Sequence, residues 1–362
     1  MIISRTPLRV TLGGGGTDLP FFYKDNGGYC LSIAINKYMY VCINRSTIDN
    51  FVRLKYSKSE KVNNINELKH GIAREILKDY KIHSNIEIAS LADVPGGTGL
   101  GSSSAYAVGL LKCLSEYKKI SYNLNQIAEK ACEIEITKLK KPIGKQDQYI
   151  SALGGLREIN INKRGNVKCN DLKIGHNYLN DLKNNMFMFY TGNLRENSSI
   201  LQNQKNKTKN KNSSIITIYK QIKSIGFKIS KELKNGNIDK IGLLFDEHWK
   251  LKKKLGKDIS NKRYDEIYSC ALENGALGGK ISGAGGGGFF TFICLRNKDM
   301  FIKKMIQNGL ENSLGNGVGN SNGVRSNSNS FKIFSVNHVN RVKPISCEEK
   351  TDSVGVILKN TH

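Results

Sequence analysis

The sequence lacks the long apolar stretches that carry proteins into or across a membrane. Nowhere in its 362 residues do eighteen apolar residues follow one another without a charge, and the first residues, MIISRTPLRV, lack the apolar core of a signal peptide. We therefore expect a cytoplasmic protein that has no membrane partner.

The sequence also lacks the cysteine patterns that hold metals or build disulfide frameworks. Its eight cysteines include no CxxC pair, and neither HExxH nor another cysteine–histidine ligand spacing occurs. This usage is typical of reduced thiols and argues against a zinc site built by the protein.

Acidic residues are scarce beside basic ones, 31 against 56, which gives a net charge of +25. Such an excess can indicate nucleic-acid binding, because cationic faces release counterions from phosphate backbones. Here the lysines alternate with asparagines, as in NQKNKTKNKN at 203–212, without an arginine-rich helix, an aromatic platform or a DNA-binding motif. We therefore predict a solvated surface that attracts small anionic substrates and no nucleic-acid partner. A basic nucleic-acid-binding protein is the rival hypothesis.

The chain length and a hydrophobic content of 39% predict two globular domains. We place an N-terminal domain at residues 1–180, a C-terminal domain at 181–340 and a polar tail at 341–362. Alternating apolar residues predict strands at 2–12, 37–46, 84–91 and 331–339. Apolar residues at helical spacing predict one helix that begins at Ser102–Ser104. The same spacing predicts four further helices, at 124–138, 215–235, 238–255 and 265–276. Residues 144–155 are expected to introduce a strand region, and 314–330 a mobile loop.

Three glycine clusters stand out, at 13–16, at 96–101 and at 283–288. One cluster alone could be turn chemistry, and the serines at 102–104 could be helix caps. In the second cluster, however, four glycines precede three successive serines between an expected strand and an expected helix. Such a loop exposes backbone N–H groups at a helix N-terminus, which favours phosphate, although the Gly-Lys-Ser/Thr ending of a Walker A loop is absent.

In order and spacing these clusters resemble the three motifs of the GHMP kinases, the family of galactokinase, homoserine kinase, mevalonate kinase and phosphomevalonate kinase. The matching segments are PLRVTLGGGGTDLP (7–20), PGGTGLGSSSA (95–105) and KISGAGGGGFF (280–290). The resemblance spans roughly residues 2–340. It implies an α/β (α+β) two-domain fold, with an N-terminal domain similar to the second domain of ribosomal protein S5 and a ferredoxin-like C-terminal domain. ATP and the acceptor would meet in the cleft between them.

The resemblance also implies roles for individual residues. Asp147 would be catalytic and accept the proton of the acceptor hydroxyl, and Arg9 would stabilise the transferring phosphoryl group. Mg²⁺ would be held by Ser103 and Glu135, with Glu133 as a possible substitute. The ATP phosphates would be wrapped by Pro95, Gly96, Gly97, Gly99, Leu100, Gly101, Ser102, Ser103 and Ser104.

For the acceptor, the motifs imply a sugar. The glutamate and histidine of galactokinase are replaced here by Gly15 and Gly16, which counts against galactose. The forms PLRxxxxGGGTDLPxxY and GKQDQY, FYTGNLRENSSIL (189–201) and HWKLKKKL (248–255) resemble the bacterial heptose 7-phosphate kinases, and secondarily the fucokinase branch. Both act on an anomeric hydroxyl. Ile143 departs from the glycine that is usual at its position in the heptose kinases.

A sugar phosphate such as D-glycero-D-manno-heptose 7-phosphate requires cations in the acceptor site, because its phosphate is a dianion. The candidates for these cations are Arg9, Lys145 and Arg195. The other residues that we assign to acceptor binding are Thr17, Asp18, Gly285 and Gly286.

Overall fold

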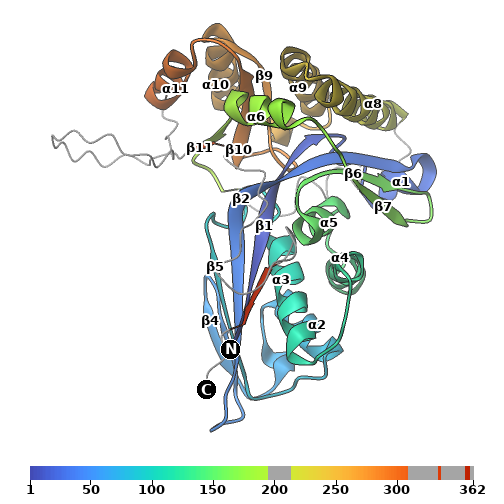
Figure 1. Cartoon of the computed structure of the whole chain (residues 1–362), viewed down its shortest axis with the longest axis vertical. Helices are drawn as coiled ribbons and strands as arrows, with labels where there is room; N and C mark the ends of the chain where they lie inside the picture. The colour runs from blue at the N-terminus through green and yellow to red at the C-terminus, as the bar shows by residue number, and fades with distance from the viewer. Residues whose placement is uncertain (195–212, 309–332, 336–354, 359–362) are drawn as a thin grey trace, which may run out of the picture.

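The computed structural model describes residues 1–194, 213–308, 333–335 and 355–358. Arg195 and the expected loop at 314–330 lie outside these residues. The described strands form two sheets, one of eight strands and one of four. Figure 1 shows the larger sheet with helices on one side, and the smaller sheet with its own helices beyond the far end of the long strands.

The larger sheet is built from strands of the N-terminal half of the chain together with β12 from its C-terminal end. Its strand order is β12-β1-β2-β5-β3-β4, and β6 and β7 extend it from β2. Its strands are β1 (Ile2–Gly13), β2 (Gly28–Arg45), β3 (Val52–Lys55), β4 (Ser59–Val62), β5 (Ile86–Ala92), β6 (Leu156–Ile161), β7 (Val167–Asp171) and β12 (Gly355–Leu358). Its helices are α1 (Pro20–Asn26), α2 (Gly71–Asp79), α3 (Ser102–Tyr117), α4 (Leu124–Cys132) and α5 (Gln146–Leu153), with a 3₁₀ turn (Ile65–Glu67) and a π-helix (Glu133–Lys138).

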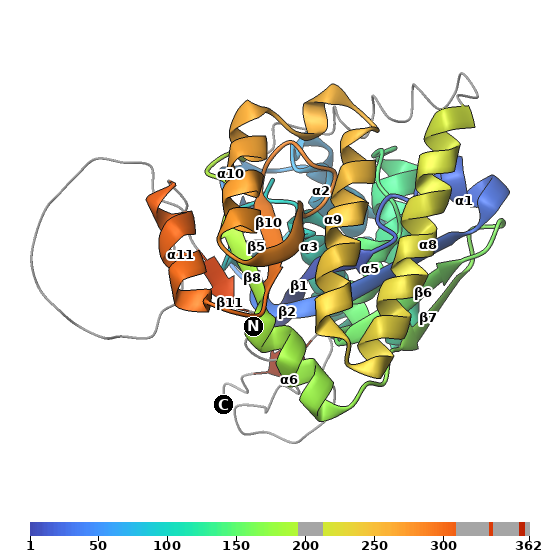
Figure 2. The same cartoon turned by 90° about the horizontal axis from the view of Figure 1, so that it is seen from above.

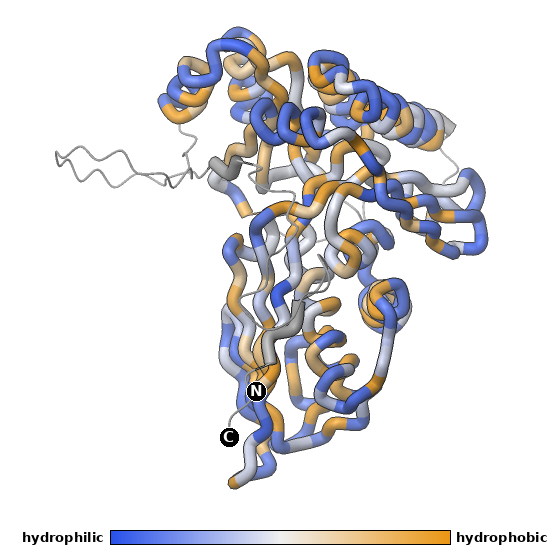
Figure 3. Tube along the Cα trace, viewed as in Figure 1, coloured by the Kyte–Doolittle hydropathy of each residue, from blue (hydrophilic) through white to orange (hydrophobic). Residues whose placement is uncertain are grey.

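The smaller sheet has the order β11-β8-β10-β9. Its strands are β8 (Met186–Tyr190), β9 (Ala276–Ile281), β10 (Phe289–Cys294) and β11 (Ile333–Ser335). Around it lie α6 (His176–Asn185), α8 (Ser213–Asn235), α9 (Ile238–Lys253), a 3₁₀ turn (Lys257–Ile259), α10 (Lys262–Glu273) and α11 (Lys298–Gln307). Figure 2 shows α8 and α9 side by side, and Figure 3 shows many hydrophilic residues along the helices of this unit. In chain order, β7 of the larger sheet ends at Asp171, and β8, the first strand of the smaller sheet, begins at Met186.

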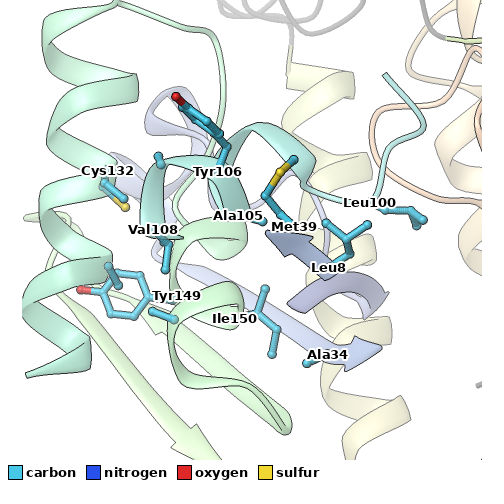
Figure 4. Close-up of a cluster of buried hydrophobic side chains, with 14 of the residues drawn as sticks. Leu8, Ala34, Met39, Leu100, Ala105, Tyr106, Val108, Cys132, Tyr149 and Ile150 are labelled. Atoms are coloured by element: carbon cyan, nitrogen blue, oxygen red, sulfur yellow. The ribbon is translucent and has the colours of Figure 1, made fainter. Parts of the chain in front are cut away.

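One buried cluster fixes the helices that carry the motif residues. Figure 4 shows Leu8 of β1, Leu100 of the second glycine cluster, Ala105 of α3 and Ile150 of α5 packed together, and each of the four is fully buried. Because protein interiors are close-packed, these side chains hold β1, the glycine cluster and both helices in one arrangement.

Two local predictions need correction. The stretch 144–155 forms the helix α5 and not a strand, since Tyr149, Ile150 and Leu153 share one face at helical spacing and Gly154 ends the helix with a φ of 64°. The helix expected at 124–138 ends as an α-helix at Cys132 and continues as the π-helix Glu133–Lys138. Within the segment expected to be a polar tail, β12 pairs antiparallel with β1.

Candidate active site

The second glycine cluster leads directly into α3. Gly97, Gly99 and Gly101 have positive φ, and α3 begins at Ser102. The Arg9 backbone N–H donates to the Leu100 carbonyl at 3.0 Å, which fixes the loop to β1. The backbone therefore adopts the left-handed turns that a phosphate-binding loop at a helix N-terminus uses.

Gly99 of this loop and Gly288 of the third glycine cluster are required by contact between the two loops. A Cβ on Gly99 would lie 2.7 Å from the Ser282 carbonyl oxygen, and a Cβ on Gly288 would lie 2.1 Å from the Thr98 carbonyl oxygen. No side chain fits at such distances. The two loops, one from each sheet, are thus in backbone contact.

Glu135 accepts hydrogen bonds from the hydroxyls of Ser103 and Ser104, two of the serines that the sequence offered as caps for α3. It is fully buried, and Ser103 Oγ and Ser104 Oγ each donate to it at 2.7 Å. Gln148 Nε2 donates at 2.8 Å, and Lys141 Nζ donates to Glu135 Oε1 at 3.1 Å and to Ser103 Oγ at 2.8 Å. The π-helix carries Glu135 into this cluster, and such local widening is frequent at functional sites.

Arg9 and Asp147 form a bidentate ion pair beside the glycine loop. Arg9 Nε donates to Asp147 Oδ1 at 2.7 Å and an Arg9 terminal nitrogen donates to Oδ2 at 2.6 Å. The other terminal nitrogen donates to the Gly99 carbonyl at 2.5 Å. The guanidinium therefore links β1, α5 and the loop and fixes the direction of the Asp147 carboxylate.

Asp18 lies buried near this pair. Its carboxylate accepts hydrogen bonds from the backbone N–H of Gly16 at 3.2 Å and of Gln146 at 3.1 Å. Burial, and secondarily the charge of Asp147, raise the pKa of Asp18. A carboxyl group that is held in this way can bind a hydroxyl group.

A cavity between the two sheets joins these residues to the C-terminal unit. From the N-terminal unit it is lined by Arg9, Thr11, Asp18, Ile143, Gln146 and Asp147. From the C-terminal unit it is lined by Tyr219, His248, Lys252, Lys280 and Ser282, among others. Carboxylates, an arginine and lysines thus surround one space, in which a small polar molecule could react.

Comparison with known proteins identifies the family. The model of the GHMP kinases N-terminal domain matches residues 66–155, and that of the GHMP kinases C-terminal domain matches residues 229–309. The chain is 30% identical over 302 residues to the D-glycero-alpha-D-manno-heptose 7-phosphate kinase of Campylobacter jejuni. These residues cover 80% of this chain and 88% of that protein. The chain belongs to the GHMP kinase family.

Two further relatives of this GHMP kinase are informative. The L-fucokinase/L-fucose-1-P guanylyltransferase of Bacteroides fragilis is 23% identical over 331 residues, which cover 81% of this chain and 34% of that longer protein. A crystal structure of a D-glycero-D-manno-heptose 1-phosphate kinase from Bacteriodes thetaiotaomicron superposes with a TM-score of 0.69 at 24% identity, over 85% of this chain and 93% of that one. The expected two-domain α/β fold is confirmed. The GHMP kinase is an ATP-dependent sugar kinase.

The structure brings some predicted acceptor residues to the cavity and not others. Arg9 and Asp18 line it. Thr17 is fully buried, and its hydroxyl donates to backbone carbonyls of Gly14 and Tyr29, so it supports the first glycine loop. The Lys145 ammonium lies 2.5 Å from a Glu129 carboxylate oxygen and is not among the lining residues.

Gly285 and Gly286 are also absent from the cavity lining. They pack against the 3₁₀ turn before α10, where the Gly286 N–H donates to the Ile259 carbonyl at 3.0 Å. Arg195 lies outside the described residues. Sequence reasoning missed His248, Lys252 and Lys280 as lining residues. All three belong to segments that carried the resemblance, His248 and Lys252 to HWKLKKKL and Lys280 to KISGAGGGGFF.

A second cavity, of about 790 Å³, adjoins the glycine loop on the other side. Its lining includes Pro95, Gly96, Ser103 and Lys141, together with the aromatic side chains Tyr56, His70 and Tyr106. The His70 ring lies 4.7 Å from that of Tyr56 and 4.8 Å from that of Tyr106, measured between centroids. The sequence could not reveal this pocket, because its aromatic residues are spread along the chain.

Among the described residues, no helix is long and apolar enough to cross a membrane. The same part of the chain contains no group of three or more histidine, cysteine, aspartate or glutamate side chains that could hold a metal ion.

Proposed function

We propose that this GHMP kinase transfers the γ-phosphate of ATP to the anomeric hydroxyl of D-glycero-D-manno-heptose 7-phosphate and forms the 1,7-bisphosphate. The observation that carries the proposal is the composition of the cavity between the sheets. Its carboxyl groups, those of Asp18 and Asp147, can bind sugar hydroxyls. It also contains three cationic side chains, those of Arg9, Lys252 and Lys280. The likeness to the heptose 7-phosphate kinase of Campylobacter jejuni supports the same acceptor.

The nucleotide would lie across the second glycine loop. The triphosphate would bind the backbone of residues 95–101 and the first turn of α3, where N–H groups and the helix dipole favour anions. The adenine would enter the second cavity and stack on the aromatic side chains of Tyr56, His70 and Tyr106. Lys141, which lines this cavity next to Ser103, is suited to a phosphate oxygen.

Ser103 and Glu135 would hold Mg²⁺. Their oxygen atoms are hard ligands, and one carboxylate with one hydroxyl is a donor set typical of Mg²⁺, which completes its shell with water and substrate phosphates. A cation here requires Lys141 to release both oxygens, which its flexible side chain allows. When bound, Mg²⁺ would neutralise charge on the β- and γ-phosphates.

In the reaction, Asp147 orients the anomeric hydroxyl and accepts its proton. The sugar oxygen forms a bond to the γ-phosphorus, and the bond from that phosphorus to the bridging oxygen of ADP breaks. Arg9 keeps the Asp147 carboxylate in place through two hydrogen bonds and contributes positive charge near the transferring group. Asp18 binds sugar hydroxyls.

Replacement of the proposed base tests this mechanism. Asp147→Asn should lower kcat by roughly 10²–10⁴-fold with little change in ATP affinity, because the amide keeps the shape but does not accept the proton. Asp171→Asn is a matched control. Asp171 is half exposed, its carboxylate lies 4.0 Å from the Arg157 guanidinium, and it is not among the residues that line the cavity. Near-normal turnover by Asp147→Asn would contradict the role of Asp147 as base.

The acceptor is tested by a coupled ADP-release screen over sugars and sugar phosphates, with the phosphorylated position identified by ³¹P NMR. The proposal requires the heptose 7-phosphate to be preferred and the new phosphate to be on the anomeric oxygen. A fucokinase-like activity is the second candidate, favoured by the match to the Bacteroides fragilis enzyme over 81% of this chain. Preference for an unphosphorylated sugar would favour that candidate.

A further inference from the structure

Three basic side chains of the C-terminal unit line the cavity between the sheets. His248 and Lys252 lie one turn apart on α9, and Lys280 lies on β9. Their exposed fractions are 3%, 8% and 3%. We call these three residues the basic wall. Long basic side chains are rarely buried to this degree unless they bind a partner, so the basic wall requires an explanation.

His248 is the most unusual of the three. Both ring nitrogens are buried, and neither has a hydrogen-bond partner within the described part of the chain. Burial, and then the charges of Lys280 and Lys252, lower the pKa of His248 well below its ordinary value. The imidazole is therefore neutral, with one N–H donor and one acceptor nitrogen, and a bound molecule could satisfy both.

The two lysines place positive charge beside this ring. Lys280 Nζ donates to the carbonyls of Thr11 at 2.6 Å and Leu12 at 2.7 Å, and Lys252 Nζ donates to those of Ile281 at 2.7 Å and Gly283 at 2.6 Å. These carbonyls fix both ammonium groups, and a neutral carbonyl does not remove the charge of Lys280. Lys280 forms no ion pair with any described residue.

The carboxylates of the same cavity do not supply a negative charge to Lys280. Asp147 is paired with Arg9. Burial raises the pKa of Asp18, which opposes its ionisation, and burial lowers the pKa of Lys280 to about 7. An incoming anion would stabilise the charged form of Lys280, so the cavity is electrostatically suited to a ligand with a negative group.

We propose that His248, Lys252 and Lys280 bind the phosphate monoester of the acceptor and so select a phosphorylated sugar. The inference rests on the proposed function, which it extends by naming the residues that determine specificity. In this arrangement the two lysines contact phosphate oxygens, and His248 donates its N–H to the phosphate while its second nitrogen accepts from a sugar hydroxyl. Lys145, the lysine that the sequence suggested for this task, faces Glu129 instead.

The first test measures anion binding directly. The dissociation constant of inorganic phosphate is determined by calorimetry on the full chain, with a non-hydrolysable ATP analogue saturating the glycine loop. His248→Phe and Lys252→Met should each weaken phosphate binding by about tenfold or more, the effect typical of losing a hydrogen bond to a charged group. Lys254→Met, which removes an exposed lysine just beyond α9, should leave phosphate binding unchanged.

The second test measures selectivity as the ratio of kcat/KM for the heptose 7-phosphate to that for the free heptose. This ratio should fall by about tenfold or more in His248→Phe and in Lys252→Met, because the phosphate group loses a partner that the free sugar never had. His248→Phe breaks no described hydrogen bond, so it separates recognition from folding better than Lys252→Met does. An equal loss for both acceptors would show a structural role and overturn the proposal.

The two tests keep this inference separate from the proposed function. If the wild type prefers free sugars, the proposed acceptor is wrong. If the wild type prefers the heptose 7-phosphate and both variants retain its phosphate affinity and its selectivity, the acceptor stands and the basic wall is not the phosphate site.

Discussion

Gly144→Ala is a sharp perturbation of the acceptor side of the cavity. A Cβ at this position would lie 1.9 Å from Asp18 Oδ2 and 2.2 Å from Asp18 Cγ. Carbon–oxygen contacts settle at about 3.3 Å or more, so the Asp18 carboxylate would have to retreat by about 1.4 Å. That movement breaks its hydrogen bond from the Gln146 N–H, which is 3.1 Å long. Gly144 does not have a positive φ, so the alanine backbone itself is unstrained.

We expect Gly144→Ala to lower kcat/KM for the acceptor by about 10²-fold, the effect of a reacting group displaced by about 1 Å. The free energy of unfolding should fall by about 1–3 kcal/mol, as for other overpacked sites. The affinity for ATP should change by less than about threefold, because Asp18 lies outside the second cavity and the glycine loop.

The measurements are steady-state kinetics with each substrate varied in turn, ATP calorimetry and thermal unfolding. Gly175→Ala is the control, because its added Cβ would meet nothing closer than 3.5 Å and its φ of −57° suits alanine. If folded Gly144→Ala keeps the kcat/KM of the wild type for the acceptor, or loses ATP affinity to the same extent, then Asp18 does not bind the acceptor as argued.

Two other predictions concern the nucleotide side. In Gly288→Ala, the new Cβ would lie 2.1 Å from the Thr98 carbonyl oxygen at a φ of 94°. The substitution should displace the glycine loop and weaken ATP binding, measured by calorimetry, by about tenfold or more. Unchanged affinity would mean that the contact between the loops does not position the nucleotide. Glu135→Gln should raise the Mg²⁺ concentration for half-maximal activity, and weaken Mn²⁺ binding followed by EPR, by at least about tenfold. Glu133→Gln, half exposed and near Lys138, is the matched control, and equal effects of both changes would remove Glu135 from the metal site.

The fold was predictable where one physical rule governs a segment. The helix α3 follows from an apolar stripe that begins after a run of serines, and it starts at Ser102 as expected. The stretch that became α5 was misjudged because its polar residues are held by tertiary contacts. Gln148 is fully buried and donates to Glu135, and Gln146 contacts Asp18. A sequence pattern treats such glutamines as exposed, so it hides the buried face of the helix.

The candidate site was predictable to the extent that its residues lie in the glycine motifs or at fixed spacing from them. Arg9, Asp18 and Asp147 come together as the resemblance implied, and Glu135 meets Ser103. Lys252 and Lys280 lie in segments that carried the resemblance, HWKLKKKL and KISGAGGGGFF, but the pattern did not single them out, since one lysine among many is distinguished only by burial. The deeply buried Lys252 and the exposed Lys254 stand two positions apart.

The glycine clusters show how a correct sequence signal can have a second physical cause. In the sequence, the glycines of the second cluster predict a loop that exposes backbone N–H groups to phosphate. In the structure, Gly99 and Gly288 are also required because each lies against the backbone of the other loop. Thr98 and Gly288 are far apart in the sequence, so periodicity within either segment could not reveal the contact. Because the two loops come from different sheets, the same contact fixes the nucleotide loop relative to the unit that carries His248 and Lys280. A substitution that separates the loops should therefore impair binding of both substrates, whereas one confined to Asp18 or to the basic wall should affect the acceptor alone.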